Sequence, residues 1–227
     1  MRAAEIALTL IIAINLFLRF TQNTTWKSGG SIILFGGLIL QVTIEGYRWQ
    51  MIPIYNLAGA LSLFSLGSFF FPPKQLVNRR VKFVGLISGL VLLGMASLLP
   101  ILIPVPNPPP PTGPYSIGTF SRMLVDESRQ ELYGGDPQQN RKIMVQVWYP
   151  AQETENLPLA PWVENTDTLG PALAELFGFP SYFLNHLKYV KSNAFHEAPP
   201  LAQDAEYPVL LFSHGWGGFR AQNKIGR

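Results

Sequence analysis

The sequence predicts a protein in two parts, an all-α membrane bundle followed by a domain of the α/β class. Only 14% of the 227 residues are charged, and the apolar residues gather before residue 105. Residues 1–112 hold 8 Lys or Arg and 2 Asp or Glu, whereas residues 113–227 hold 9 and 12. An apolar, basic front half joined to a slightly acidic back half is typical of a membrane domain that carries a soluble one.

The composition also excludes several kinds of site. The chain contains no cysteine, so disulfides, thiolate metal sites and a cysteine nucleophile are excluded. The net charge of +3 comes from the front half. Because the back half has no basic stripe interleaved with aromatic residues, we expect no nucleic-acid partner.

Four apolar stretches predict the membrane domain, residues 1–104. They are Ala3–Phe20, Gly29–Ile44, Pro53–Phe71 and Phe83–Ile103. The fourth has 21 residues and no formal charge. At about 1.5 Å per residue it can cross a hydrocarbon core of about 30 Å. The first stretch contains charged residues and the second is short, so either could instead be re-entrant or interfacial. We expect about four transmembrane helices, with two or three as the alternative.

The basic residues near these stretches predict their orientation. Arg2 and Arg48 lie on one side of the predicted bundle. The other six flank the first and third connections: Arg19, Lys27, Lys74, Arg79, Arg80 and Lys82. Because Lys and Arg resist translocation, we expect these two connections in the cytoplasm. The prediction is a multi-pass membrane protein with the lipid bilayer as its partner and its C-terminal domain on the extracytoplasmic side.

Polar and small residues inside the stretches have more than one interpretation. Glu5, Asn15 and Asn56 could mark a polar pathway, since polar groups are costly in lipid, but their positions favour a structural role. Gly85 and Gly89 lie four residues apart in the fourth stretch. They either let another helix approach closely or reflect only the abundance of glycine in membrane helices.

A proline-rich linker, residues 105–114, separates the two parts. Its sequence is VPNPPPPTGP, and proline neither continues a helix nor allows one just before it. Beyond the linker, alternating residues predict strands near 116–126 and 142–149, joined as an antiparallel hairpin by the turn-forming Tyr133–Asn140. The remaining predictions are a surface excursion at 151–166, helices at 168–179 and 181–195, and a strand covered on both faces at Pro208–Ser213.

The last predicted strand leads into a glycine-rich turn, Ser213-His214-Gly215-Trp216-Gly217-Gly218. Glycines there let main-chain N–H groups approach a developing alkoxide closely. Together with RKIMVQVWYPA and GPYSIGTFSRMLVDESR upstream, this block resembles the platelet-activating factor acetylhydrolase type of lipase over roughly residues 113–227. The resemblance implies an α/β-hydrolase fold. It also implies a serine esterase that removes short or oxidised acyl groups from phospholipids without a metal or organic cofactor.

The same resemblance gives roles to the residues of the loop. The backbone N–H of Trp216 would be one oxyanion donor, while His214, Gly215, Gly217 and Gly218 would shape the turn. The alternatives are a packing role for His214 beneath the loop and no special role for the indole of Trp216.

The catalytic triad of such an esterase is not found in the chain. The serine is presented in a G-x-S-x-G elbow, with an acid and then a histidine after it, and no G-x-S-x-G occurs. Asp167, His186, His196 and Asp204 all precede the glycine loop, and we expect the two histidines to be surface or capping residues.

We therefore expect an incomplete α/β-hydrolase at residues 115–227, truncated after its first strands and oxyanion loop and inactive as written. Two alternatives remain. One is a non-catalytic membrane protein whose hydrolase remnant serves as a docking module. The other is one half of a split enzyme.

Overall fold

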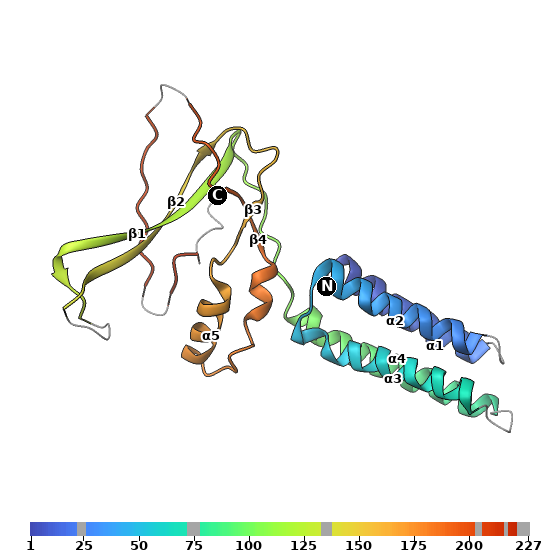
Figure 1. The fold of residues 1–227 in the computed structure, drawn as a ribbon. Helices are drawn as coiled ribbons and strands as arrows, with labels where there is room; N and C mark the ends of the chain where they lie inside the picture. The colour runs from blue at the N-terminus through green and yellow to red at the C-terminus, as the bar shows by residue number, and fades with distance from the viewer. Residues whose placement is uncertain (22–25, 72–77, 133–137, 203–205, 216–217, 222–227) are drawn as a thin grey trace. The chain divides into compact units, whose positions relative to one another are not determined.

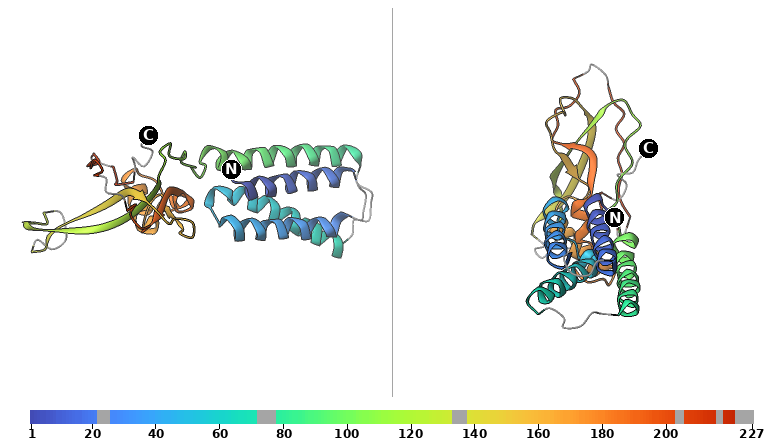
Figure 2. Two further views of the ribbon diagram at one scale, coloured as in Figure 1. Left: turned by 90° about the horizontal axis from the view of Figure 1, so that it is seen from above. Right: turned by 90° about the vertical axis from the view of Figure 1, so that its right-hand side faces the viewer.

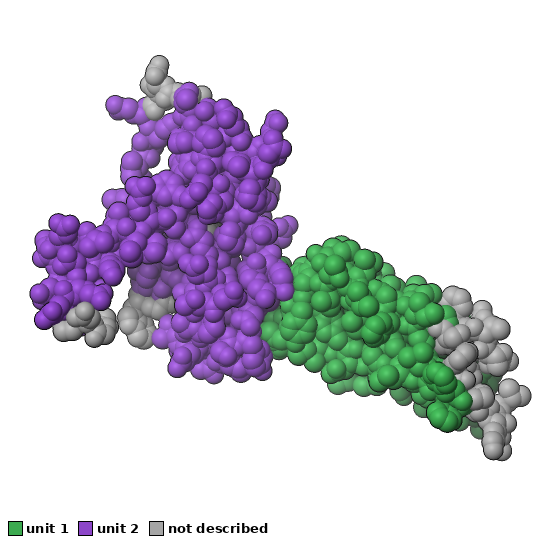
Figure 3. All heavy atoms as spheres, in the orientation of Figure 1, with its two compact units in different colours: residues 1–105 green, residues 106–227 purple. Residues whose placement is uncertain are grey.

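A computed structural model describes residues 1–21, 26–71, 78–132, 138–202, 206–215 and 218–221. The chain divides into two compact units, Met1–Val105 and Pro106–Arg227, which are coloured separately in Figure 3. In the described residues of the first unit, all regular secondary structure is helical. Those of the second combine a four-stranded sheet with helices (Figure 1). The chain thus has an all-α part followed by an α/β part, as the sequence predicts.

Four long helices form the first unit: α1 (Ala3–Thr21), α2 (Trp26–Glu45), α3 (Ile52–Phe70) and α4 (Arg79–Leu102). A short 3₁₀ helix, Trp49–Met51, precedes α3. Both α1 and α3 pack against α2 and α4 (Figure 2). The core of the unit consists of Leu8, Ile12, Leu16, Leu34, Met51, Ile54, Ala58, Leu93 and Ala96.

Three segments of the described chain are long and apolar enough to cross a membrane, namely Ala3–Thr21, Trp49–Ser68 and Arg79–Leu102. Gly29–Glu45 is a shorter apolar helix. Each of the four corresponds to one of the apolar stretches in the sequence.

Gly89 allows α1 and α4 to lie close together. A Cβ at this buried position would lie 2.8 Å from Cδ2 of Leu16, so a larger residue would force Leu16 to move. At Gly85 a Cβ would meet nothing within 4 Å. Close helix approach therefore explains Gly89 but not Gly85.

A buried ion-pair network lies at one end of the helical unit. Glu5 is fully buried in α1. Its carboxylate lies 2.7 Å from Nε of Arg48 and 2.9 Å from a terminal guanidinium nitrogen of Arg2. Since Arg48 is also buried, the two opposite charges neutralise each other away from water.

The same network caps two helices. Arg48 donates to the carbonyl oxygens of Pro100 and Ile103, at 3.2 and 3.1 Å, where α4 ends. Glu45 accepts a hydrogen bond of 2.7 Å from the backbone N–H of Ala4 in the first turn of α1. A helix leaves its last carbonyl groups and its first N–H groups without partners in the helix. Here the cationic Arg48 pairs with carbonyls at the C-terminus of α4 and the anionic Glu45 pairs with an N–H at the N-terminus of α1, which are the signs that the helix dipole favours.

Asn15 holds a second polar contact inside the unit. Its Nδ2 donates to the carbonyl of Gly30 at 3.2 Å, and its Oδ1 accepts from Nε of Arg19 at 2.7 Å. Asn56, in contrast, is exposed on α3. Glu5 and Asn15 thus have the structural contacts that their positions favoured.

We expect Glu5→Gln to lower the free energy of unfolding by about 3 kcal/mol, because Arg48 would remain buried without its opposite charge. Thermal unfolding of the full chain in detergent, followed by circular dichroism, measures the change. The control is Arg80→Gln, which removes an exposed charge from the same unit and should change stability by less than about 0.5 kcal/mol. Equal effects would show that the buried pair does not hold the unit together.

The second unit is built on a mixed sheet with the strand order β2-β1-β4-β3. The strands are β1 (Ser116–Gln130), β2 (Asn140–Ala151), β3 (Leu159–Pro161) and β4 (Lys191–His196). The hairpin of β1 and β2 is antiparallel, as predicted, and extends beyond the predicted bounds. β4 runs parallel to β1 and antiparallel to β3. Residues 133–137 of the predicted hairpin loop lie outside the described residues.

One of the two predicted helices of this unit is confirmed and the other is wrong. The first is α5 (Thr166–Leu176). In place of the second, a 3₁₀ helix at Asn185–Tyr189 leads into β4. Residues Ser192 and Ala194 are buried in alternation with less buried neighbours. Because β1 offers a free edge beside them, pairing with β1 outweighs the helical spacing of the sequence.

Two other predictions for this unit are wrong. The segment 151–166 is not only a surface excursion, since it contains β3 and buries Ala160 and Val163. Residues 208–213 do not form a covered strand. Val209 and Leu210 are 85% and 93% exposed, and no described segment pairs with them. A strand buried on both faces needs neighbouring strands and covering helices, and none of the described segments takes these positions.

Candidate oxyanion loop

In the described part of the glycine-rich loop, Ser213, His214 and Gly215 are exposed and Gly218 is half-buried. The N–H of Gly218 donates to the carbonyl of Gly215 at 3.0 Å. His214 is exposed, and its Nδ1 lies 3.1 Å from the same carbonyl. His214 thus contacts the backbone of the loop and does not pack beneath it. Trp216, the predicted oxyanion donor, and Gly217 lie outside the described residues.

Gly215 has space for a side chain. A Cβ there would meet nothing within 4 Å, so neighbouring atoms do not require glycine. The role of Gly215 in letting a substrate oxygen approach stays a prediction.

The residues after the loop hold its end against the rest of the unit. The ring of Phe219 meets the ring of Trp162 edge-on, with centroids 6.1 Å apart. The guanidinium of Arg220 donates to the carboxylate of Glu164 at 2.9 Å, and Ala221 is buried. Trp162 and Glu164 both follow β3. The loop is therefore anchored where it ends.

Glu164 is itself fixed by the hairpin. The hydroxyl of Ser121 in β1 donates to its Oε2 at 2.5 Å, and Nε2 of Gln146 in β2 donates to its Oε1 at 3.2 Å. The same Nε2 lies 3.3 Å from Oγ1 of Thr119. The residue Thr119 is fully buried. One carboxylate thus connects two strands to the end of the glycine loop.

The sequence did not predict this anchor. Arg220 lies two residues after the last glycine of the turn, and this closeness is the one signal that the sequence contains. Its partner Glu164 lies 56 residues earlier, in a stretch that looks like a surface excursion, so nothing in the local pattern connects the two.

The remaining candidate residues that the structure describes lie on other elements of the unit. His186 is buried, with Nδ1 3.2 Å from the carbonyl of Phe183, so the surface alternative is wrong for this residue. Its contact with a carbonyl just before the 3₁₀ helix is compatible with the capping alternative. His196 is exposed in β4, and Asp167 lies exposed in the first turn of α5. Asp204 lies outside the described residues. Among the described residues, no group of three or more His, Asp or Glu could hold a metal ion.

Comparison with known proteins defines the family. The mixed sheet and its helices belong to the α/β class. The sequence profile of the family described as platelet-activating factor acetylhydrolase, isoform II, matches residues 106–223, which is more than half of the chain. This chain belongs to that family, as the sequence blocks predict.

A curated relative gives the extent of the similarity. The platelet-activating factor acetylhydrolase of Cavia porcellus is 29% identical over 116 residues. The match covers 50% of this chain and 23% of that protein, so the chain corresponds to about a quarter of the length of the relative. No solved structure matched the chain.

Replacing Glu164 should loosen the end of the glycine loop. In Glu164→Ala we expect the backbone amides of residues 218–221 to exchange hydrogen about tenfold faster, because Arg220 loses a charged hydrogen bond worth about 1.5 kcal/mol. Hydrogen exchange with mass spectrometry on the full chain measures this. The control is Glu155→Ala, which removes an exposed carboxylate and should leave the exchange unchanged. Similar exchange in the two variants would contradict the anchoring role.

Proposed function

We propose that the second unit is the N-terminal part of a serine carboxylester hydrolase of the phospholipase type, similar to acetylhydrolases, with phospholipid esters as its substrates. One observation carries this proposal. The family match, residues 106–223, contains the whole glycine loop, and residues 213–215 of that loop are exposed while its end is anchored.

The chemistry proposed for the loop is binding of an oxyanion. When a nucleophile attacks an ester carbonyl, negative charge develops on its oxygen, and backbone N–H groups aimed at that oxygen lower the barrier. We assign one such donor to Trp216. Donors help most when they need no rearrangement during the reaction, and the contacts of Phe219 and Arg220 with Trp162 and Glu164 favour a fixed loop end.

The 227-residue chain should be inactive by itself. Oxyanion donors accelerate the reaction only after a nucleophile has begun to attack, and the chain has no G-x-S-x-G elbow. A segment that supplies the serine, the acid and the histidine would complete the site. The exposed apolar run Val209–Phe212 favours this idea, because such a run is suited to pairing with further strands.

A fluorophosphonate probe tests this proposal directly. The purified 227-residue chain should not be labelled, and it should hydrolyse p-nitrophenyl acetate no faster than buffer does. Joining or co-expressing a hydrolase segment that carries a G-x-S-x-G elbow should produce labelling of the elbow serine. Labelling of any serine in the isolated chain would contradict the proposed inactivity. A completed protein that folds but takes no label would favour the docking module.

We assign a membrane domain to residues 1–104, a linker to residues 105–114 and the hydrolase domain to residues 115–227. The outward positions of the helices support the membrane assignment, since Ile32, Leu63 and Phe64 are each 70% exposed or more. A helix that is apolar on all sides belongs in a protein core or in lipid. About four helices would then span the bilayer, with the hydrolase domain on the extracytoplasmic side.

Fusion of alkaline phosphatase after Arg227 tests the orientation. We expect an active reporter, because six of the eight Lys and Arg residues near the helices lie at the opposite end and resist translocation. Green fluorescent protein at the same position should be dark after export and serves as the complementary control. Fluorescent fusions without phosphatase activity would place the hydrolase domain in the cytoplasm and would contradict the orientation.

A further inference from the structure

An open cavity of about 700 Å³ lies at the end of the helical unit where α1 ends and α4 begins. Its lining combines two cationic, one polar and three apolar side chains: Phe20, Asn78, Arg79, Arg80, Phe83 and Val84. The volume is within the range of ligand sites in proteins, about 300 to 1,000 Å³. The cavity shares no residue with the glycine loop.

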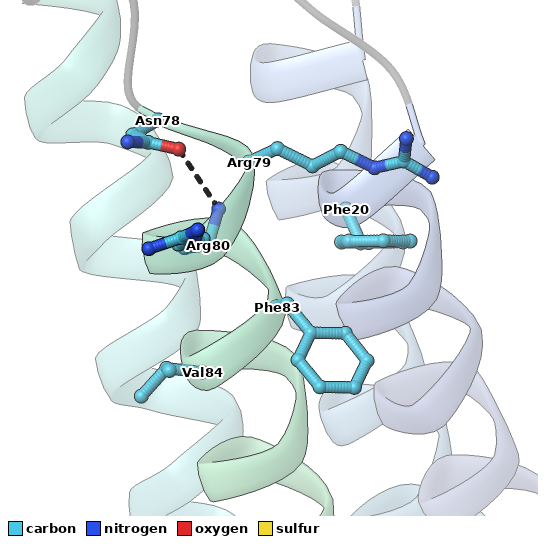
Figure 4. A pocket seen from close by; sticks show the side chains of 6 residues that line it. All are labelled: Phe20, Asn78, Arg79, Arg80, Phe83 and Val84. Carbon is cyan, nitrogen blue, oxygen red and sulfur yellow. Dashed lines mark hydrogen bonds between the residues drawn. The ribbon is translucent and has the colours of Figure 1, made fainter.

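Two arginines supply the charge of this cavity. Within the described residues, neither guanidinium has an ion-paired or hydrogen-bonded partner, and α4 has no acidic residue in its first turn. Figure 4 shows Arg79 reaching from α4 toward α1. In contrast, Arg2 and Arg48 at the other end of the unit are both paired with Glu5. The positive charge at this cavity is therefore not neutralised by the described residues.

The side chain of Asn78 already pairs one backbone N–H group in the first turn of α4, so that group is not offered to an anion. Oδ1 of Asn78 accepts a hydrogen bond of 3.1 Å from the backbone N–H of Arg80 (Figure 4). The two guanidinium groups remain as donors. Guanidinium is the side-chain group that best matches a phosphate, because it offers several N–H donors in one plane.

Apolar side chains lie one helical turn away from the charges. Phe83 follows Arg79 by four residues and Val84 follows Arg80 by four, a rise of about 6 Å along the helix. The rings of Phe20 and Phe83 meet edge-on with centroids 6.1 Å apart. Phe83 and Val84 are 53% and 62% exposed. The cavity thus presents a cationic layer directly beside an apolar one.

We propose that this cavity binds one anionic phospholipid, with the phosphate held by Arg79 and Arg80 and the first part of an acyl chain against Phe20, Phe83 and Val84. This inference uses the proposed membrane insertion of the helical unit. A phospholipid has both a phosphate and a hydrocarbon chain at about this separation, and the bilayer supplies it at high concentration. The site is distinct from the proposed ester substrate site in the second unit.

Native mass spectrometry of the full chain in detergent tests the proposal. We expect phosphatidylglycerol to bind more tightly than phosphatidylcholine. The double variant Arg79→Gln/Arg80→Gln should lose about tenfold or more in affinity for phosphatidylglycerol, because each basic residue contributes to attraction of anionic lipid. The control Arg141→Gln/Lys142→Gln removes the same charge from β2 and should bind as the original chain does. Phe83→Ala should weaken binding of both lipids.

Further arms separate the possible sources of the anion. Glycerol phosphate, the soluble part of the lipid, should not displace phosphatidylglycerol. Equal displacement by glycerol phosphate would show a site for soluble anions and would overturn the proposal, as would equal binding of the two lipids or full binding by the arginine variant. Carbonate extraction of cell membranes measures membrane insertion separately. Extraction of the original chain would contradict the membrane assignment, whatever lipid binding shows.

Discussion

The second unit depends on the pairing of strand β1 on both of its edges. Residues Ile117–Thr119 are antiparallel partners of β2 and parallel partners of β4 at the same time. Gly118 sits in this stretch directly under the ring of Tyr149, where a Cβ would lie 2.5 Å from a ring carbon. The Tyr149 hydroxyl donates to the carbonyl of Ala198 at 2.6 Å, and burial together with the charge of Glu197 raises its pKa. A tyrosine phenol is protonated at neutral pH in any case, and the raised pKa keeps this one a donor in more alkaline solution. Because Gly118 has no side chain, the ring of Tyr149 can lie over β1, and its hydroxyl can bond to Ala198 in the segment that follows β4.

The helical unit must place charged groups in an almost wholly apolar structure, and it does so differently at its two ends. Near the start of α1, the charges of Arg2 and Arg48 are balanced by Glu5 and Glu45, and the network caps the ends of neighbouring helices. At the opposite end, Arg79 and Arg80 have no acidic partner among the described residues. A count of Lys and Arg treats all of these residues alike. The difference in net charge between the two ends is greater than the count implies, since the paired arginines contribute little field.

The features that the sequence predicted well are those encoded in local patterns. Long apolar runs predicted α1 to α4, and alternation predicted the hairpin of β1 and β2, because both patterns repeat over many residues. The short strands β3 and β4 were not predicted. Their positions depend on the edge of β1 that receives them, and the sequence around β4 has helical spacing.

The contacts of Glu5 with Arg48 and of Glu164 with Arg220 join residues 43 and 56 positions apart. No local pattern identifies such partners, although a charged residue within an apolar run shows that a partner is needed. The glycine turn was recognised from its residues, whereas its anchor emerged only from the fold.

The two arms of the glycine loop are held in different ways, and the difference bears on the proposed catalysis. After the turn, Phe219 and Arg220 are fixed by Trp162 and Glu164. Before it, Val209–Phe212 are exposed and pair with no described strand. An oxyanion donor must be placed to within a few tenths of an ångström, since hydrogen bonds weaken steeply with distance and angle. Contacts on the second arm alone do not fix the direction in which the first arm enters the loop. Parallel strands are stable when they are paired and covered on both faces, so a further strand beside 208–213 would fix the first arm. In the proposed enzyme, the segment that contributes the nucleophile would then also set the geometry of the oxyanion donor, and folding of the domain and assembly of its active site would be one event.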